Sequence, residues 1–519
     1  MSDLLVPSLT SGEPTRGIHS LPNETLNQIF TSGSLTLSTN PATNTSPAFT
    51  LLLVCRNWRA LAMALPPLWT TLDFDCCYLE KKWGRSTAEV LLWKFAQLCL
   101  SKSTMQPLDL TFCCHLIGAP MAKLAQFGAT SDRWVSLTLV SNTLTAIVND
   151  QKHFVGFPAL RSMDIRMLSR PLGRISDYSG PIIDIGDDPD WEPFDGAALN
   201  LPSLKLLRVQ LRMSLSHRID AHDGFLGLPR AIGTGITHLT IINCAHLGTF
   251  SERMRAALTV NMTFLTHFHL HLSASTPKIS NSLAPTQPSA LTLPFVTHLF
   301  VDGGMKNRES CHDDAWRHLA FLRLPALTHL HISQAAPEDR DPSTDPHFCR
   351  FISECRQVRT LATRGVGLKH SMALLEALNP EVLMISTPFD NTPARAVLCN
   401  LFKDMLEGNQ SIHDLHSIAV YDSNSSGALL AEDCTKLVEG SARLFQEEIG
   451  CDMDLRPKTI AIHSRVPPSK TFRTHAHGRA GSVVVVKLCF HMHPPCFLPQ
   501  AADSGEWFSD FDCRGMIPL

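Results

Sequence analysis

A short pattern of apolar residues recurs along most of this chain and constrains its fold more than any other feature. The pattern is apolar-Pro-x-apolar-x-x-apolar-x-apolar, as in FPALRSMDI, LPSLKLLRV, LPFVTHLFV and LPALTHLHI, and ITHLTI, MTFLTHFHL and IHDLHSIAV repeat it without the proline. Most copies are spaced by ~30 residues, close to the period of proteins that stack one strand per unit. The first strand position of each copy is predicted at Leu137, Met163, Leu207, Leu239, Phe268, Leu299, Leu330, Leu361, Leu383 and Ile418.

Segments with helical spacing fall between these strand positions. Apolar residues recur every three or four positions in SERMRAALTVNM, DDAWRHLAFLRL, PHFCRFISECRQ, SMALLEALNP and ARAVLCNLFKDMLEG. One strand and one helix per unit predict an α/β solenoid over residues 131–425. A doubly wound α/β domain with a single sheet is the alternative. The widest gap holds an insert at 170–198 rich in Pro, Gly and Asp, which we expect to be a loop that is free to contact a partner.

The Leu-x-x-Leu-x-Leu kernel of each unit resembles the repeat of leucine-rich-repeat proteins. The resemblance implies short parallel strands on one side of the solenoid and helices on the other. No unit has the Asn with which ordinary leucine-rich repeats hydrogen-bond their stacked loops. The pattern therefore predicts stacked units without predicting how regularly the array curves.

Histidines fall at alternating strand positions in four of the units. Side chains alternate between the two faces of a strand, so His329 and His331 face away from a core that contains Leu330. Neighbouring strands are ~4.8 Å apart, which predicts a ladder. The ladder is either a metal- or pH-responsive surface that is cationic below about pH 6, or the result of repeat duplication. Rungs with one His each form no tetrahedral metal pocket. The candidate target-binding residues are His238, His267, His269, His298, Phe300, His329 and His331.

Two apolar segments precede the repeats. In LPNETLNQIF, Pro22 suits a helix start, and Leu26, Ile29 and Phe30 share one helical face. After a polar loop, LLLVCRNWRALAMALPPLW predicts a second helix from near residue 49 to Pro66, with an apolar stripe. A module of fewer than ~60 residues cannot bury this much apolar surface alone. The stripe is expected to dock a partner or, as the alternative, to pack against the rest of the chain.

The order of these motifs, LP-x-E, IF, VCRxW and P-x-LW, resembles an F-box, the module that joins target-binding subunits to SCF ubiquitin ligases. The long loop between the motifs is similar to that of divergent fungal members of the family, in which degenerate repeats often follow the F-box. The resemblance implies a three-helix module that binds a Skp-type adaptor and, through it, a cullin scaffold. The adaptor-binding residues implied in this way are Leu21, Pro22, Ile29, Phe30, Val54, Cys55, Trp58 and Trp69.

The expected organisation has five parts. Residues 1–17 form a disordered tail, 18–75 the F-box, 76–130 a connecting helix and strand where the repeats start, 131–425 the solenoid, and 426–519 a C-terminal cap and irregular tail. The C-terminal part includes the candidate helix LLAEDCTKLVEGSARLFQEEIG and the candidate strand SVVVVKLCF. It also holds His475, His477, His491 and His493 near Cys489 and Cys496, in a spacing that fits no familiar zinc module.

Composition narrows the function classes. A net charge of −3 gives no electrostatic case for binding nucleic acid or an acidic membrane. The 16 Cys include no CxxC pair, and no signal peptide or membrane-length apolar run is present, which favours a cytoplasmic or nuclear protein. Phosphate-loop, GxSxG and HExxH motifs are absent, so no catalytic residue, metal or cofactor is predicted. The expected function is substrate recognition for an SCF-type ligase, with an unidentified target protein. The alternatives are a non-ligase F-box scaffold and an enzyme in an α/β domain.

Overall fold

The structure, a computed structural model, divides into two compact units, Met1–Met163 and Asp164–Leu519, which are described separately. This division does not follow the boundary expected at residue 130. In the described part of the chain, no helix is long and apolar enough to cross a membrane. The described residues are 21–32, 36–42, 44–112, 128–140, 156–166, 201–210, 235–244, 258–259, 262–272, 290–303, 316, 319–334, 345–355, 357–364, 366, 368–387, 415–422, 459–464, 473–477 and 483–490.

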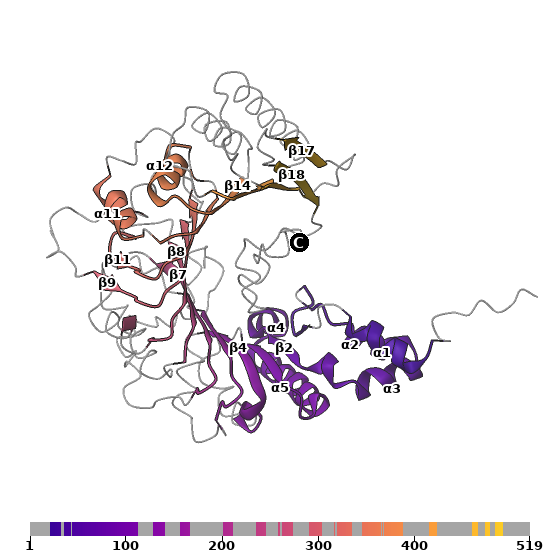
Figure 1. Cartoon of the computed structure of the whole chain (residues 1–519). Coiled ribbons are helices and arrows are strands. Elements are labelled where there is room, and N and C mark those ends of the chain that lie inside the picture. Colours follow the sequence, from indigo (N-terminus) through magenta and orange to yellow (C-terminus); the bar gives the residue numbers. More distant parts are fainter. Residues whose placement is uncertain are drawn as a thin grey trace, which may run out of the picture. The chain divides into compact units, whose positions relative to one another are not determined.

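Helices dominate the start of the first unit (Figure 1). The described helical elements are α1 (Asn23–Thr31), α2 (Ala48–Val54), α3 (Arg56–Ala64), the 3-10 turn η2 (Pro66–Trp69), α4 (Cys76–Trp83), α5 (Arg85–Ser103) and the 3-10 turn η3 (Ser131–Arg133). The single helix expected from residue 49 to 66 was wrong, because the chain breaks at Cys55. Cys55 is extended (φ −158°, ψ 171°), and its Sγ accepts a hydrogen bond from the Trp58 N–H at 3.4 Å. The thiol thus caps a new helix.

The first unit also contains a run of parallel strands, of which the repeat pattern indicated only the last, around Leu137. They are β1 (Leu37–Ser38), β2 (Thr71–Phe74), β3 (Leu108–Phe112) and β4 (Trp134–Val140), paired in that order. Leu37 pairs with Leu72, Leu72 with Leu110 and Leu110 with Leu137. The loop expected between the first two helices therefore includes a strand. Its Ser38 hydroxyl donates to the Asp73 carboxylate at 2.7 Å, which ties this segment to β2.

The predicted repeat strands are confirmed, since all ten first strand positions lie in strands. β5 (Ser162–Arg166) spans the sequence boundary between the units. In the second unit follow β6 (Leu206–Gln210), β7 (His238–Cys244), β8 (His267–Leu272), β10 (His298–Gly303), β12 (His329–Gln334), β13 (Thr360–Arg364), β14 (Val382–Thr387), β15 (Ser417–Asp422), β16 (Thr459–Ser464), β17 (Arg473–His477) and β18 (Val483–Phe490). From Leu207 to Ile418, each first position pairs with the next in a parallel ladder.

The ladder continues beyond the recognised repeats through β16 to β18, and only β17 pairs antiparallel among these described strands. The expected strand SVVVVKLCF is β18. Two short strands, β9 (Leu291–Thr292) and β11 (Leu322–Arg323), form a separate parallel pair at the proline-containing part of two units. The fold is thus α/β with a long parallel sheet of solenoid type.

Two described helices of the second unit lie on one side of its strands, toward the edge of Figure 1. They are α11 (Pro346–Glu354) and α12 (Leu368–Leu378), and both match predicted helices. The Asp345 carboxylate accepts a hydrogen bond from the His347 N–H at 2.8 Å and caps α11. Strand residues such as Leu330 and Ile332 are almost fully buried, as are Phe351 of α11 and Leu374 of α12. Hydrophobic burial at alternating strand positions therefore provides the core.

Several predicted features fall outside the described residues. They are the tail at 1–17, the insert at 170–198, the helix ARAVLCNLFKDMLEG and the C-terminal helix, while the helix at 251–262 is mostly outside. Of the helix expected at 313–324, residues 316 and 319–324 are described, and its end was wrong, because Leu322 and Arg323 form the strand β11. Of the C-terminal metal candidates, only the backbone of His475, His477 and Cys489 is described, and their side chains are not. Among the described residues, no group of three or more His, Cys, Asp or Glu side chains is arranged to hold a metal ion.

Candidate functional site

Two of the expected adaptor-binding residues belong to the core of the first unit. Trp69 is fully buried, and its indole Nε1 donates a hydrogen bond to the Ala62 carbonyl at 2.8 Å. Phe30 is 3% exposed, and its ring meets that of Trp58 edge-on with centroids 5.1 Å apart. These aromatic side chains join α1, α3 and η2 to each other. Their placement as partner-facing residues is therefore corrected.

Other residues of this set reach the surface. Ile29 is 44% exposed and Val54 is 46% exposed, and Pro22 is also exposed, whereas Leu21, Cys55 and Trp58 are half-buried. Leu53 is 81% exposed, and the sequence interpretation missed it. Four consecutive apolar residues from Leu51 to Val54 cannot all face inward on one helix, which is the signal that identifies Leu53. We call Ile29, Leu53 and Val54 the exposed apolar set.

The second candidate surface is the polar face of the second unit, defined as the first, third and fifth residues of β7, β8, β10, β12 and β13. Its first position holds His238, His267, His298 and His329, paired in register across four strands. Adjacent rings are stacked, with centroids 4.0–4.1 Å apart and planes within 11–12° of parallel. The predicted histidine ladder is therefore present.

A threonine before each of these histidines fixes its ring. Thr266 Oγ1 lies 2.9 Å from His267 Nδ1, and Thr297 Oγ1 lies 2.8 Å from His298 Nδ1. The same contacts occur in the units of His238 and His329. The Thr266 carbonyl in turn accepts the backbone N–H groups of the next unit's Thr-His pair, at 2.9 and 3.0 Å. The repeated Thr-His pair therefore helps to hold successive units together.

The third position is buried, contrary to the expectation of an exposed face. Thr240, His269 and His331 are 2–5% exposed. Phe300 lies between the two histidine rings, with centroids 4.1 Å from His269 and 4.0 Å from His331. Alternation along a strand gives the side on which a residue lies, but not how deeply neighbouring side chains bury it.

Burial also overturns the expected titration near pH 6. Desolvation lowers the pKa of His238 to about 4 and that of His298 to about 3. Burial lowers the pKa of His331 to about 3, with a smaller contribution from the Arg364 guanidinium, and lowers that of His269 well below its ordinary range. These four rings are neutral at pH 6, so they do not form a switch at mildly acidic pH.

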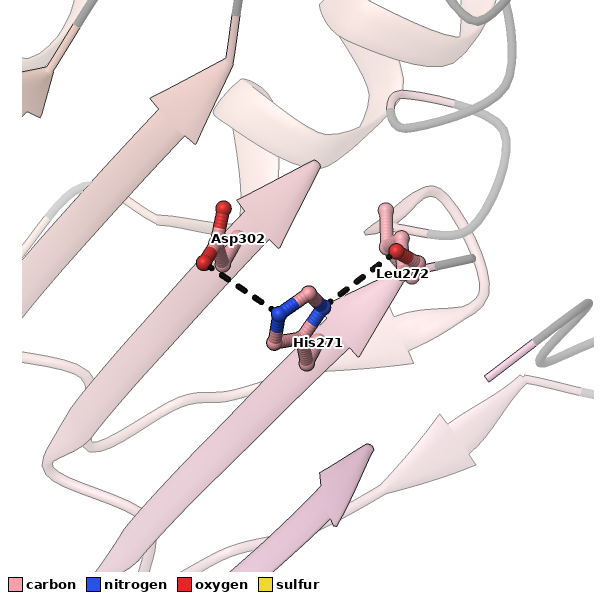
Figure 2. Close-up of polar contacts among 3 residues, drawn as sticks. All are labelled: His271, Leu272 and Asp302. Carbon is pink, nitrogen blue, oxygen red and sulfur yellow. Dashed lines mark hydrogen bonds and ion pairs between the residues drawn. The ribbon is translucent and has the colours of Figure 1, made fainter. Parts of the chain in front are cut away.

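The fifth position carries a different residue in each unit, and no prediction was made for it. His271, Asp302, Ser333 and Arg364 are register partners on β8, β10, β12 and β13. His271 Nε2 lies 3.6 Å from Asp302 Oδ2, and its Nδ1 lies 3.4 Å from the Leu272 carbonyl (Figure 2). Extending the strand alternation by two residues beyond the third position would have identified this row.

The order of this row argues against a nucleophilic triad. A triad requires the imidazole to contact both the hydroxyl and the carboxylate. Here Asp302 lies between the other two residues, so His271 and Ser333 are two strand spacings, or ~9.6 Å, apart. This Ser, His and Asp grouping therefore does not support an enzymatic role.

No family model matches this chain, and no curated protein matches it. Among solved structures, it is similar to a protein from Bacteroides fragilis, with a TM-score of 0.29 and 14% identity over 46% of this chain. The alignment spans 64% of that protein's length. At this level of similarity the match carries no functional argument.

Proposed function

We propose that this protein is a substrate-recognition adaptor of an SCF-type ubiquitin ligase. In this proposal the first unit is an F-box that docks to a Skp-type adaptor, and the second unit is a leucine-rich-repeat-like array that binds a target protein. The order of the motifs around Leu21, Phe30, Trp58 and Trp69 supports the first part, as do the three short helices that carry them. Binding, not chemistry, is the activity proposed for the chain.

The observation that carries the proposal is the exposed apolar set. Leu53 is 81% exposed next to Val54 at the end of α2, while Phe30 and Trp69 hold the helices together. Burying exposed leucine, isoleucine and valine side chains is a main source of binding free energy, because it removes apolar surface from water. We propose that the adaptor covers these side chains. Pro22 and the half-buried Leu21, Cys55 and Trp58 would lie at the edge of the same contact.

Target binding is proposed for the polar face of the second unit. The first-position histidines His238, His267, His298 and His329 are half-buried, so their ring edges are available to a partner, as is the half-buried Phe300. Neutral stacked imidazoles offer hydrogen bonds and flat apolar surface together. The buried His269 and His331 support this surface from below and are not proposed to touch the target.

The test is affinity purification of the full chain from cells with the proteasome inhibited. The double variant Leu53→Ser, Val54→Ser should lose the Skp-type adaptor and the cullin, because neither side chain contributes much to the core. The matched control is Met105→Ser, since Met105 is 80% exposed in the same unit but lies outside the motifs. Equal adaptor capture by the double variant and the control would refute the proposed contact. Adaptor capture without cullin by the wild-type chain would favour the scaffold function.

A further inference from the structure

We call the fifth-position residues His271, Asp302, Ser333 and Arg364 the polar row. The row combines a negatively charged acceptor, the Asp302 carboxylate, with a positively charged donor, the Arg364 guanidinium. Its residues occupy adjacent strands at the same level of the parallel sheet, near the carboxyl ends of β8, β10, β12 and β13. The carboxyl ends of parallel strands are where α/β proteins most often place ligand-binding side chains. The row therefore has the location of a binding site as well as its chemistry.

The hydrogen-bonding capacity of the row is largely unused within the described residues. Asp302 has a side chain that is 17% exposed, and its one contact there is His271 Nε2 at 3.6 Å, which is beyond hydrogen-bond distance. Ser333 is 1% exposed, and its Oγ has no hydrogen-bond partner. Arg364 makes no ion pair with a described carboxylate. The Asp302 carboxylate, which reaches the surface, therefore keeps acceptor capacity for a ligand.

The charges of the row define what the ligand must carry. A cation beside Asp302 would be held by the carboxylate, and the half-buried Phe300, two residues earlier on the same face, offers its ring to that cation. Arg364 repels a cation from the other end and attracts a carboxylate. Asp302 and Arg364 are two strand spacings apart, ~9.6 Å. Alternate side chains of an extended peptide are separated by ~7 Å, which long charged side chains can match.

We propose that the polar row binds a segment of the target protein in which an Arg or Lys lies two or three positions from an Asp or Glu. The basic side chain pairs with Asp302, and the acidic side chain pairs with Arg364. This inference rests on the proposed target-binding function of the second unit. It assigns to that function the chemical class of the recognised segment, and the half-buried histidines beside the row provide a neutral platform for the rest of the peptide.

The experiment is selection of peptides from a random display library on the full-length protein. The wild-type chain should enrich peptides with one basic and one acidic residue at this spacing. Arg364→Glu should enrich peptides with two basic residues, because both ends of the row are then acidic. Asp302→Lys should enrich peptides with two acidic residues. Enrichment without charge preference, or the same preference in all three proteins, would overturn the proposal.

A second measurement covers the case in which a reversed charge prevents folding. Asp302→Asn and Arg364→Gln preserve the size of each side chain and remove its charge. Binding of a selected peptide, measured by fluorescence anisotropy, should weaken by roughly tenfold in each variant, since each loses a charge-assisted contact. An unchanged affinity in both variants contradicts the proposal. Peptide selection involves no Skp-type adaptor, so its failure is distinguishable from failure of the adaptor proposal.

Discussion

Acidification should destabilise this protein through its buried histidines. His269 and His331 are 2% and 5% exposed, and both have a pKa below the ordinary value of 6.5 in the folded chain. Arg208 and Arg364 add to this effect, since each guanidinium disfavours a proton on the neighbouring ring. Unfolding exposes both imidazoles to water, where they recover the ordinary pKa. Below pH 6.5 the unfolded chain therefore takes up protons that the folded chain does not.

The sign and size of the effect follow from this difference in bound protons. Stability rises with pH wherever the unfolded state binds more protons. The stabilisation that depends on these two neutral rings is therefore fully present above pH 6.5, and it is lost as the pH falls toward the folded pKa of about 3 for His331. Each ring contributes about 1.4 kcal/mol per pH unit in this window. Between pH 6.5 and 5 the pair costs about 4 kcal/mol. The stacked rings of His238 and His298, with pKa values of about 4 and about 3, add to this loss in the same direction.

Chemical denaturation of the full chain between pH 7.5 and 5, followed by circular dichroism, measures this dependence. The variant His331→Leu removes one titrating ring, so its stability should fall less steeply by about 1.4 kcal/mol per pH unit. His416→Gln is the control, because His416 is exposed just before β15. If the wild-type chain is equally stable at pH 5 and pH 7, or if His331→Leu leaves the slope unchanged, the argument from buried neutral rings is refuted.

Three further outcomes are expected. Trp69→Ala should lower the free energy of unfolding by about 3–5 kcal/mol, because it empties a fully buried site, and a small effect by denaturant titration would place the indole outside the core. Thr297→Val should destabilise the chain by about 1 kcal/mol through loss of the contact with His298, and Thr297→Ser should restore the thermal midpoint. Cys355 is buried with a pKa raised to about 12, so alkylation of the native protein at pH 8, read by mass spectrometry, should modify the exposed Cys349 first.

The repeat strands were predictable because their signal is local. In the units that contain the proline, a turn, an apolar residue and an alternating apolar pair fall within nine residues, as in LPALTHLHI around Leu330. The register of the sheet follows because each strand pairs with the equivalent residues of the strand in the next unit. β1, with only Leu37 and Ser38, carries no such signal, and its place in the sheet depends on pairing with residues more than thirty positions away. Short strands that are defined by tertiary contacts alone are not readable from sequence.

The candidate sites were only partly predictable, for two physical reasons. Helical periodicity identified Phe30, and the F-box-like order of motifs identified Trp69, but an apolar residue at a module's surface and one in its core have the same pattern. The break at Cys55 then changed which side chains face outward, and Leu53 became exposed. For the histidines, strand alternation predicted the correct face, but the neighbours that bury His331 come from other parts of the fold.

A comparison of successive units distinguishes positions of the polar face that repeat the same residue from positions that vary. The first position holds His in four successive units, and each ring is fixed by its own Thr and stacked on the next ring, so the same residue serves the same packing contact every time. The fifth position holds His, Asp, Ser and Arg in neighbouring units, and the contact between His271 and Asp302 is not repeated between the next pairs of the row among the described residues. Packing selects a repeated residue because equivalent positions have equivalent neighbours. A particular partner requires different groups at defined points, so under the proposed target-binding function the varied row, and not the repeated ladder, is where this face would encode the identity of a target.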